Sequence, residues 1–405
     1  MTGCIRIKWE YVFRLLVFWI WTRDTLLEYV RAVIMRLPIV GGYPDLVLAV
    51  VFAAIVLLAL PYYRITGGDF AFLLIVVDVF LYQWIFHEDV QGYLDKYMVS
   101  FVVKILPLYI VGVSLGESEN REQIIHTMYF LSMITLVADI VYKIAFGTPM
   151  SAVVSQYHGD MDRAYKLLPH LCLIVYFAVK QTNLWNIAFS VIGGFYLLML
   201  GTRGAAMIFL VLIAFLLING KTSKSLFTRT IVVFGTIGAF LASPLFEMSV
   251  FWMYRKAQQF GLSIRIFDKL LSGKLAFSGS RDIISETLLQ AVAKGPLFGY
   301  GICADRVIAG TYAHNIVIEL WVEFGVLLGT AIFGILIMTL IRGYLNAKGE
   351  GEKGLILILF FSAFCMLFLS GSYLDKRLML FLLGLCVCSN RRKNVLCRGD
   401  EKVNQ

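Results

Sequence analysis

Charged residues are scarce in this chain. Asp, Glu, Lys and Arg make up 16% of its 405 residues, whereas hydrophobic residues make up 59%. A soluble domain usually carries about 25% charged and about 45–50% apolar residues. The scarcity of charge therefore excludes a soluble globular enzyme and a disordered protein. The apolar runs are continuous, as over residues 46–60, which excludes the alternating strands of an outer-membrane barrel.

Patterns for metal ligands and disulfides are also absent. The seven cysteines show no zinc-ligand spacing, and Cys386 and Cys388 lie too close in sequence to form a CxxC motif. The long segment 248–313 has no DxD pattern for a divalent cation, and the one DxD-like run, 160–162, lies in another short loop. The N-terminus lacks a small-residue cleavage site, so we do not expect a removable signal peptide. We expect no metal, no cofactor and no disulfide framework.

Long apolar runs dominate what is present. A helix needs about 20 apolar residues to cross the hydrocarbon core of a membrane. Residues 9–34 are apolar but interrupted by charges, and form either a span or an amphipathic helix lying on the membrane. With this segment, the sequence predicts an all-α polytopic membrane protein with about 11–12 transmembrane helices. The eleven clear runs are 46–63, 69–86, 99–116, 125–145, 167–180, 185–201, 204–219, 230–247, 315–341, 354–372 and 377–390.

Lys and Arg in the short loops predict the orientation. The C-terminal tail and loops 220–229 and 342–353 are basic and fall on one side when the spans alternate, and the positive-inside rule assigns that side to the cytoplasm. These loops account for much of the net charge of +9, and we expect no nucleic-acid partner. The predicted organisation is an N-terminal amphipathic or first membrane segment (1–45), a transmembrane helix bundle (46–247), an outer helical loop (248–313), C-terminal transmembrane helices (314–390) and a cytoplasmic basic tail (391–405).

Three residues predicted at the outer face could carry chemistry. Arg203 lies in a tight GTRG turn between two spans, Arg281 follows an SGS run at the start of a helical pattern, and His314 lies where the outer loop re-enters the membrane. Taken singly, each also fits a structural role, such as a snorkelling arginine or an interfacial histidine. Together, two arginines suit a diphosphate, because the guanidinium fork pairs with phosphate oxygens. A nearby histidine suits activation of an attacking hydroxyl.

Three blocks of the sequence resemble a known family. LMLGTRGAAMIFLVLIAF, SGSRDIISETLLQAVAKGPLFGYG and YAHNIVIELWVEFGVLLG are similar, in their order and spacing, to the O-antigen polymerase and O-antigen ligase superfamily of bacterial inner membranes. The resemblance is best over about residues 185–345. It implies a GT-C-type glycosyltransferase fold with one large periplasmic helical loop. It also implies a periplasmic active site formed by the matching residues Arg203, Arg281 and His314. Further candidates for substrate binding are Asn315, Tyr312, Arg265 and Lys256.

The function implied by the resemblance is the polymerisation of undecaprenyl-diphosphate-linked oligosaccharide repeat units into O-antigen or capsular polysaccharide. The transfer would invert the anomeric carbon, with lipid diphosphate as the leaving group. Membrane lipids and a chain-length regulator protein are the other expected partners. One alternative is an O-antigen ligase that moves glycan onto a lipid A core. Gly325 and Gly329 are four residues apart, whereas the ligase pattern has two glycines three apart. The alternative from another class is a polysaccharide or lipid transporter, although no internal repeat supports it.

Overall fold

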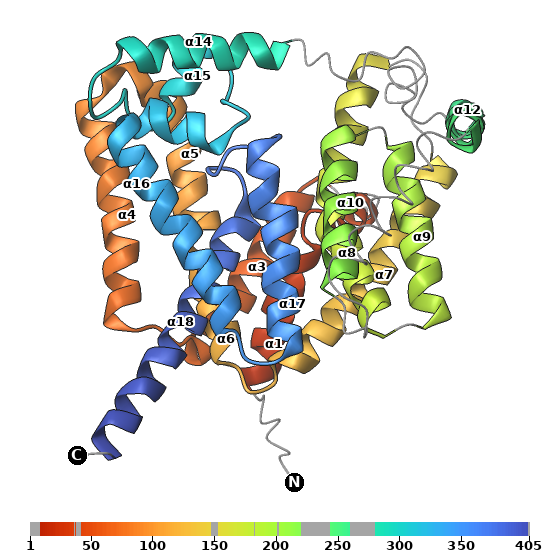
Figure 1. Cartoon of the computed structure of the whole chain (residues 1–405), viewed down its shortest axis with the longest axis horizontal. Coiled ribbons are helices and arrows are strands. Elements are labelled where there is room, and N and C mark those ends of the chain that lie inside the picture. Colours follow the sequence, from red (N-terminus) through yellow and green to blue (C-terminus); the bar gives the residue numbers. More distant parts are fainter. Residues whose placement is uncertain are drawn as a thin grey trace. The chain divides into compact units, whose positions relative to one another are not determined.

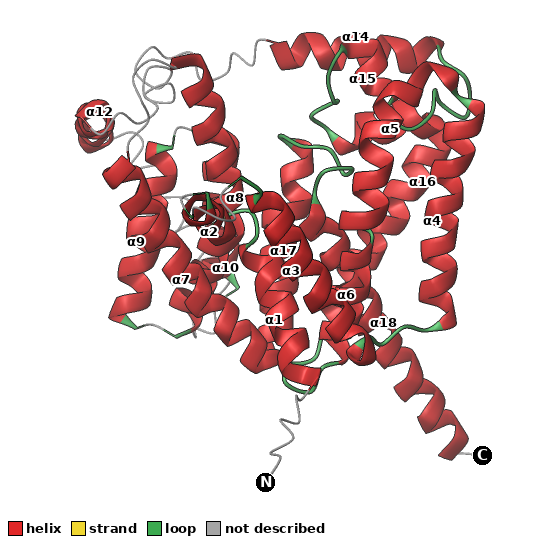
Figure 2. Ribbon diagram, turned by 180° about the vertical axis from the view of Figure 1, so that it is seen from behind, coloured by secondary structure: helices red, strands yellow, loops and turns green. Residues whose placement is uncertain are grey.

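The computed structural model describes residues 9–35, 37, 42–146, 153–181, 183–200, 202–219, 244–259 and 280–403. Within these ranges all regular structure is helical and no strand occurs (Figure 2). The all-α part of the prediction is thus confirmed, and the lengths of the apolar helices are consistent with a polytopic membrane protein. Five helical segments are long and apolar enough to cross a membrane: Gly67–Phe86, Glu88–Glu117, Arg121–Ile144, Ile316–Asn346 and Glu350–Phe368.

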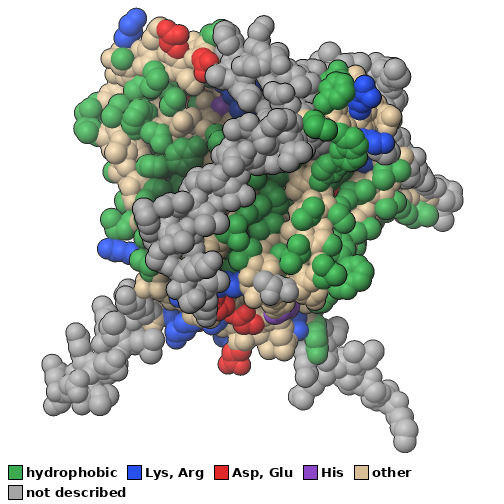
Figure 3. Space-filling model, turned by 45° about the vertical axis from the view of Figure 1, so that its right-hand side comes forward, with side chains coloured by type: hydrophobic (Ala, Val, Ile, Leu, Met, Phe, Trp, Pro, Cys, Tyr) green, Lys and Arg blue, Asp and Glu red, His purple; other side chains and the backbone are tan. Residues whose placement is uncertain are grey.

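The number of spans stays a prediction. Three apolar helices are shorter than these five, namely Leu46–Tyr62, Leu184–Met199 and Arg203–Ile218. Most of the run predicted at 230–247 lies outside the described residues. On the face drawn in Figure 3, hydrophobic side chains cover much of the surface of the described helices. This distribution is the one expected of helices that contact lipid along their length.

The chain folds into two compact units, each built from two separate segments. The first comprises Met1–Tyr62 and Gln123–Phe277, and the second comprises Tyr63–Glu122 and Ser278–Gln405. The helices predicted to form one bundle over 46–247 are therefore shared between both units. The predicted boundaries mark membrane and loop segments, whereas the units are defined by packing.

The first unit is assembled mainly by helix packing around α8 and α1. Helix α8 packs on α9 and α10, and α1 packs on α3 with Phe13 and Leu16 fully buried. Segment 9–34 is two helices separated by a turn at 23–25, where the charged pair Arg23-Asp24 interrupts the apolar pattern. The elements, most of them labelled in Figure 1, are α1 (Trp9–Thr22), α2 (Leu26–Ile34), α3 (Pro44–Ala59), η1 (Leu60–Tyr62), most of α7 (Arg121–Phe146), α8 (Val153–Lys180), α9 (Leu184–Met199), α10 (Arg203–Ile218) and α12 (Pro244–Gln259).

A buried carboxylate links four helices of this unit. Asp139 of α7 accepts hydrogen bonds from the hydroxyls of Tyr29 and Tyr196, the latter at 2.6 Å. Arg163 of α8 donates its Nε to the same carboxylate at 2.9 Å. A buried charge is costly unless it is paired and hydrogen-bonded, and Asp139 is both. The cluster therefore ties α2, α8 and α9 to α7.

The second unit contains the close pairing of α6 with α18. A Cβ added to Gly112 of α6 would lie 2.2 Å from the carbonyl oxygen of Phe381, and one added to Gly384 of α18 would lie 2.0 Å from that of Tyr109. Small residues let membrane helices approach this closely. The elements are α4 (Gly67–Phe86), η2 (Glu88–Val90), α5 (Gln91–Ser100), η3 (Phe101–Ile105), α6 (Pro107–Glu117), α14 (Ser280–Lys294), α15 (Ala304–Ala309), α16 (Ile316–Asn346), α17 (Glu350–Leu359), η4 (Phe360–Phe364), η5 (Cys365–Phe368) and α18 (Arg377–Val403).

Ion pairs fasten one end of the second unit. Arg391 of α18 donates both Nη atoms to Asp69 of α4 at 2.5 Å. Glu352 of α17 pairs with Arg121 at 3.3 Å and with Arg392. These contacts hold the start of the C-terminal tail against the ends of α4 and α17.

The opposite end of this unit is covered by the described part of the predicted outer loop. Helices α14 and α15 lie across the ends of α4, α5 and α16 (Figure 1). An apolar cluster of Val90, Leu288, Ala304, Ala313 and Val322 joins them. The helix predicted from the SGSRD pattern is confirmed as α14, which ends before Gly295-Pro296 because proline cannot continue it.

Helix α16 is broken at Gly325, whose φ of 76° and ψ of 165° are not helical. The chain just before α15 fills the break. Tyr300 N–H donates to the carbonyl of Val322 at 2.8 Å, and Gly301 N–H donates to that of Glu323 at 3.0 Å. The carbonyls released by the break are thereby satisfied, as buried backbone groups require.

Candidate functional site

Arg281 lies in the first turn of α14 with its guanidinium partly buried. Its Nη1 donates to the carbonyl oxygen of Leu369 at 2.8 Å. Within the described part of the chain, no carboxylate pairs with this arginine. The N-terminal end of a helix also carries partial positive charge. The arginine and the helix end together suit an anionic ligand.

His314 lies in the loop before α16 and has a left-handed backbone, with φ of 56°. Its ring packs on that of Tyr312, with centroids 4.0 Å apart. Its Nδ1 is buried and has no hydrogen-bond partner among the described residues. Burial and, as the smaller cause, the positive charge of Arg281 together lower the pKa of His314 to about 4. The imidazole is therefore neutral near pH 7 and has a nitrogen that can accept a proton.

Asn315 has a structural role that the sequence interpretation missed. It is the N-cap of α16, and its Oδ1 accepts hydrogen bonds from Val317 N–H at 2.9 Å and Ile318 N–H at 3.4 Å. Capping fixes where the helix begins and thus where His314 stands. The predicted contact of Asn315 with substrate stays a prediction.

The predicted site residues are divided between the two units. Arg281, Tyr312, His314 and Asn315 belong to the second unit, where the Tyr312 ring packs on His314 and the charge of Arg281 lowers the pKa of His314. Arg203 begins α10 of the first unit and is partly buried. Lys256 lies on α12 of the first unit and donates to Gln259 Oε1 at 3.1 Å. Arg265 lies outside the described residues.

Sequence analysis also missed a buried carboxylate cluster at this end of the second unit. Asp305, Glu319 and Glu323 are fully buried, and each offers an oxygen within 4.8 Å of the others. Arg306 Nη1 lies 2.7 Å from Asp305, 3.5 Å from Glu319 and 4.0 Å from Glu323. The three carboxylates could hold a metal ion by their spacing, but Arg306 already supplies a cation among them. Glu319 and Glu323 stand four apart in an apolar run, and this was the available signal, because such charges share one helix face and need a partner.

Ser372 and Tyr373, in the segment that precedes α18, complete this cluster. Arg306 Nη2 donates to Ser372 Oγ at 2.7 Å, and the Ser372 hydroxyl donates to Glu319. The Tyr373 hydroxyl donates to Glu323 Oε2 at 2.5 Å. Burial raises the pKa of Asp305, although the charge of Arg306 opposes the rise. The cluster therefore binds α15, α16 and the 369–373 segment into one rigid arrangement.

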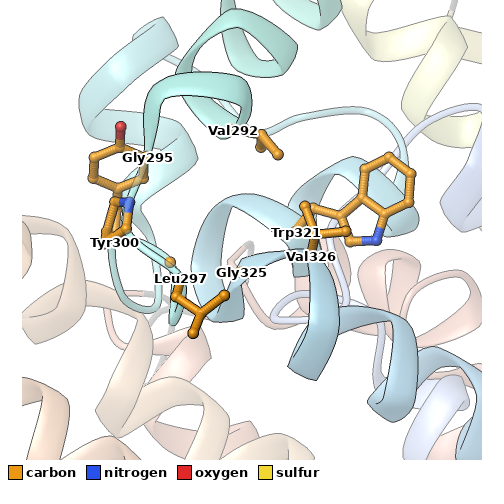
Figure 4. A pocket seen from close by; sticks show the side chains of 9 residues that line it. Val292, Gly295, Leu297, Tyr300, Trp321, Gly325 and Val326 are labelled. Atoms are coloured by element: carbon orange, nitrogen blue, oxygen red, sulfur yellow. The ribbon is translucent and has the colours of Figure 1, made fainter.

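A pocket of about 140 Å³ lies where the loop before α15 meets the break in α16 (Figure 4). Its two aromatic residues have their polar atoms engaged elsewhere. Trp321 Nε1 donates to Thr330 Oγ1 at 2.9 Å, and the Tyr300 hydroxyl donates to the Ala291 carbonyl at 3.1 Å. The pocket thus presents mainly apolar groups and backbone. The lining residues are Val292, Gly295, Pro296, Leu297, Gly299, Tyr300, Trp321, Gly325 and Val326.

Comparison with models of protein families, with curated proteins and with solved structures gives no match to this chain.

Proposed function

We propose that this chain is a membrane glycosyltransferase that polymerises oligosaccharide repeat units carried on a lipid diphosphate such as undecaprenyl diphosphate. The observation that carries the proposal is a neutral histidine, His314, whose pKa is lowered by burial and by the charge of Arg281, an arginine with no carboxylate partner in the described chain. A base and an anion-binding group acting on the same substrate are what glycosyl transfer from a lipid diphosphate requires.

The reaction is a single displacement. The hydroxyl oxygen of the incoming lipid-linked unit forms a bond to the anomeric carbon of the growing glycan, and the bond from that carbon to the diphosphate oxygen breaks. His314 accepts the hydroxyl proton. The electron pair of the broken bond leaves with the diphosphate, whose negative charge Arg281 stabilises. Inversion at the anomeric carbon follows from one displacement.

Three parts of the proposal rest on the sequence. We propose Arg203 as a second contact of the diphosphate. We also propose that the fold is of the GT-C type and that the reaction takes place on the periplasmic side of a bacterial inner membrane. Five membrane-length helices are compatible with this setting.

The proposal is tested by replacing Arg281. Loss of one donor to a developing negative charge typically costs about 10²–10³-fold in kcat, so Arg281→Ala should abolish visible polymer while the protein accumulates normally. Arg281→Lys should restore activity only in part, because an ammonium lacks the guanidinium fork. The measurement is glycan length made by purified protein from a lipid-linked repeat unit.

The matched control is Lys294→Ala, which removes an exposed cation from the last turn of the same helix. It should leave glycan length unchanged. Normal polymer from Arg281→Ala at wild-type protein level would refute the proposal. Transfer of glycan to a lipid A core without elongation would support the ligase, and movement of glycan across the membrane without new bonds would support a transporter.

A further inference from the structure

Asp305 connects the loop that carries His314 to the buried Arg306. Its Oδ2 accepts a hydrogen bond at 2.9 Å from the backbone N–H of Ala313, the residue just before His314. Its Oδ1 accepts from Arg306 Nη1 at 2.7 Å and from Arg306 N–H at 2.9 Å. The Asp305 side chain is fully buried, so neither oxygen has water as a substitute partner.

The same Arg306 also holds the segment that contacts Arg281. Its Nη2 donates to Ser372 Oγ at 2.7 Å. Three residues earlier in that segment, the carbonyl of Leu369 accepts from Arg281 Nη1 at 2.8 Å. The Arg306 guanidinium therefore connects the segments that hold His314 and Arg281, and it contacts neither of these side chains directly.

The backbone of His314 needs such support. A left-handed conformation is uncommon and strained for a residue with a side chain, and it persists only where the surroundings impose it. The hydrogen bond from Ala313 to Asp305 anchors the residue immediately before this conformation.

We propose that Asp305, acting with Arg306, is a positioning residue that fixes the loop of His314 relative to the segment that contacts Arg281, in the geometry needed for transfer. This inference rests on the proposed function for its catalytic meaning. One oxygen of Asp305 accepts from Ala313, next to the base His314, and the other accepts from Arg306, which holds the segment that contacts Arg281. These contacts connect the base to the diphosphate-binding group without taking part in the reaction.

Asp305→Asn is the sharpest variant. Asparagine has the same shape but only one acceptor oxygen, so its NH₂ group must face either the Ala313 N–H or the Arg306 guanidinium, both of which are donors. One of the two bonds is lost without a cavity being made. The release of His314 should lower kcat on the order of 100-fold, the cost of about 1 Å of misplacement, while KM for the lipid-linked donor stays unchanged.

The decisive readout does not depend on activity. Protein labelled with ¹³C-histidine is titrated by NMR, and the resonance that disappears in His314→Ala identifies His314 among the five histidines. The wild-type resonance should titrate near pH 4. In Asp305→Asn it should move toward the ordinary value of about 6.5, because the ring leaves its buried place beside Arg281.

Glu352→Gln is the matched control. Glu352 is also buried and also accepts from arginines, but at the opposite end of the second unit. Its loss should lower protein level while leaving kcat per molecule and the His314 titration unchanged. If Asp305→Asn does not accumulate, Ser372→Ala removes the partner of Arg306 Nη2 and should raise donor KM by loosening the segment that contacts Arg281.

The inference is overturned if the His314 titration is unmoved in Asp305→Asn, or if the variant keeps kcat within about twofold, well below the expected misplacement cost. It is also overturned if Asp305→Asn costs the same factor in a His314→Ala background, since residues acting through one another are not additive. A wild-type protein that does not elongate glycan, with the titration shift intact, would refute the proposed function and leave the structural link standing.

Discussion

His314 shows how position in the fold can set the chemistry of one side chain. Two causes act in the same direction: burial disfavours the charged ring, and Arg281 repels the extra proton. Its Nδ1 has no partner within the described chain, so the group is kept neutral and able to accept a proton. An exposed histidine at the same helix end would be about half charged near pH 6.5.

Activity should therefore persist into unusually acid solution. Because His314 has a pKa of about 4, single-turnover elongation should stay level from pH 7 to about 5 and decline as the pH falls through 4. The unfolded histidine titrates near pH 6.5, so the unfolded chain takes up the proton first. The contribution of His314 to the free energy of unfolding is thus fully present above about pH 6.5 and decreases as the pH falls from there to about 4. A pH–rate profile with its acid limb at 6.5 would show that His314 is not the base.

Gly325 is the residue on which the shape of α16 depends. A Cβ added there would lie 2.0 Å from the carbonyl oxygen of Leu297, and its φ of 76° with ψ of 165° is a conformation that almost only glycine adopts. The break orients the first turns of the helix, which carry Glu319 and Glu323, independently of the long remainder.

Gly325→Ala should destabilise the second unit. Backbone strain alone costs on the order of 1–3 kcal/mol, and the clash with Leu297 adds to it. The thermal midpoint of purified protein in detergent should fall, together with activity.

Gly334→Ala in the same helix is the control for that substitution. Nothing lies within 4 Å of a Cβ at Gly334. Alanine favours a helix over glycine by about 1 kcal/mol, so this variant should keep or raise the midpoint. Equal destabilisation by both substitutions would contradict the role assigned to Gly325.

The helices were predictable where apolar composition marks them, but their ends often were not. Helix α8 extends back to Val153 although its apolar run begins at residue 167, because hydrogen bonding continues through residues that hydropathy does not register. Arg281 and His314 could be found because each stands beside a local signal, an SGS run and an apolar helix start. Asp305 could not, because its importance comes from Ala313 and Arg306, contacts that only folding creates.

The second unit has two chemically different ends. At one, Arg391 and Arg392 pair with Asp69 and Glu352. At the other lie Arg281, His314 and the Asp305 cluster. Helix α16, with 31 residues, runs between the loops at these two ends. Its part after the break, residues 326–346, is roughly 30 Å long at about 1.5 Å per residue, which matches the roughly 30 Å hydrocarbon core.

The two loops flanking α16 should therefore face opposite sides of the membrane. Phe298 is 75% exposed before the helix, and Lys348 is exposed after it. In right-side-out vesicles, a membrane-impermeant maleimide should label Phe298→Cys at once and Lys348→Cys only after permeabilisation. The wild-type protein measures the background labelling of the seven native cysteines, of which Cys172, Cys303, Cys386 and Cys388 are buried and Cys365 is half-buried. Labelling of both variants before permeabilisation would refute this arrangement.

The break in α16 also sets an order of events during biosynthesis. The segment that fills it, Gly299–Gly301, precedes the helix in the chain and is therefore translated before its partner. The carbonyls of Val322 and Glu323 can be satisfied as soon as the helix forms only if that segment is already waiting on the same side of the membrane. Delivery of the outer loop to its side of the membrane thus has to precede completion of α16.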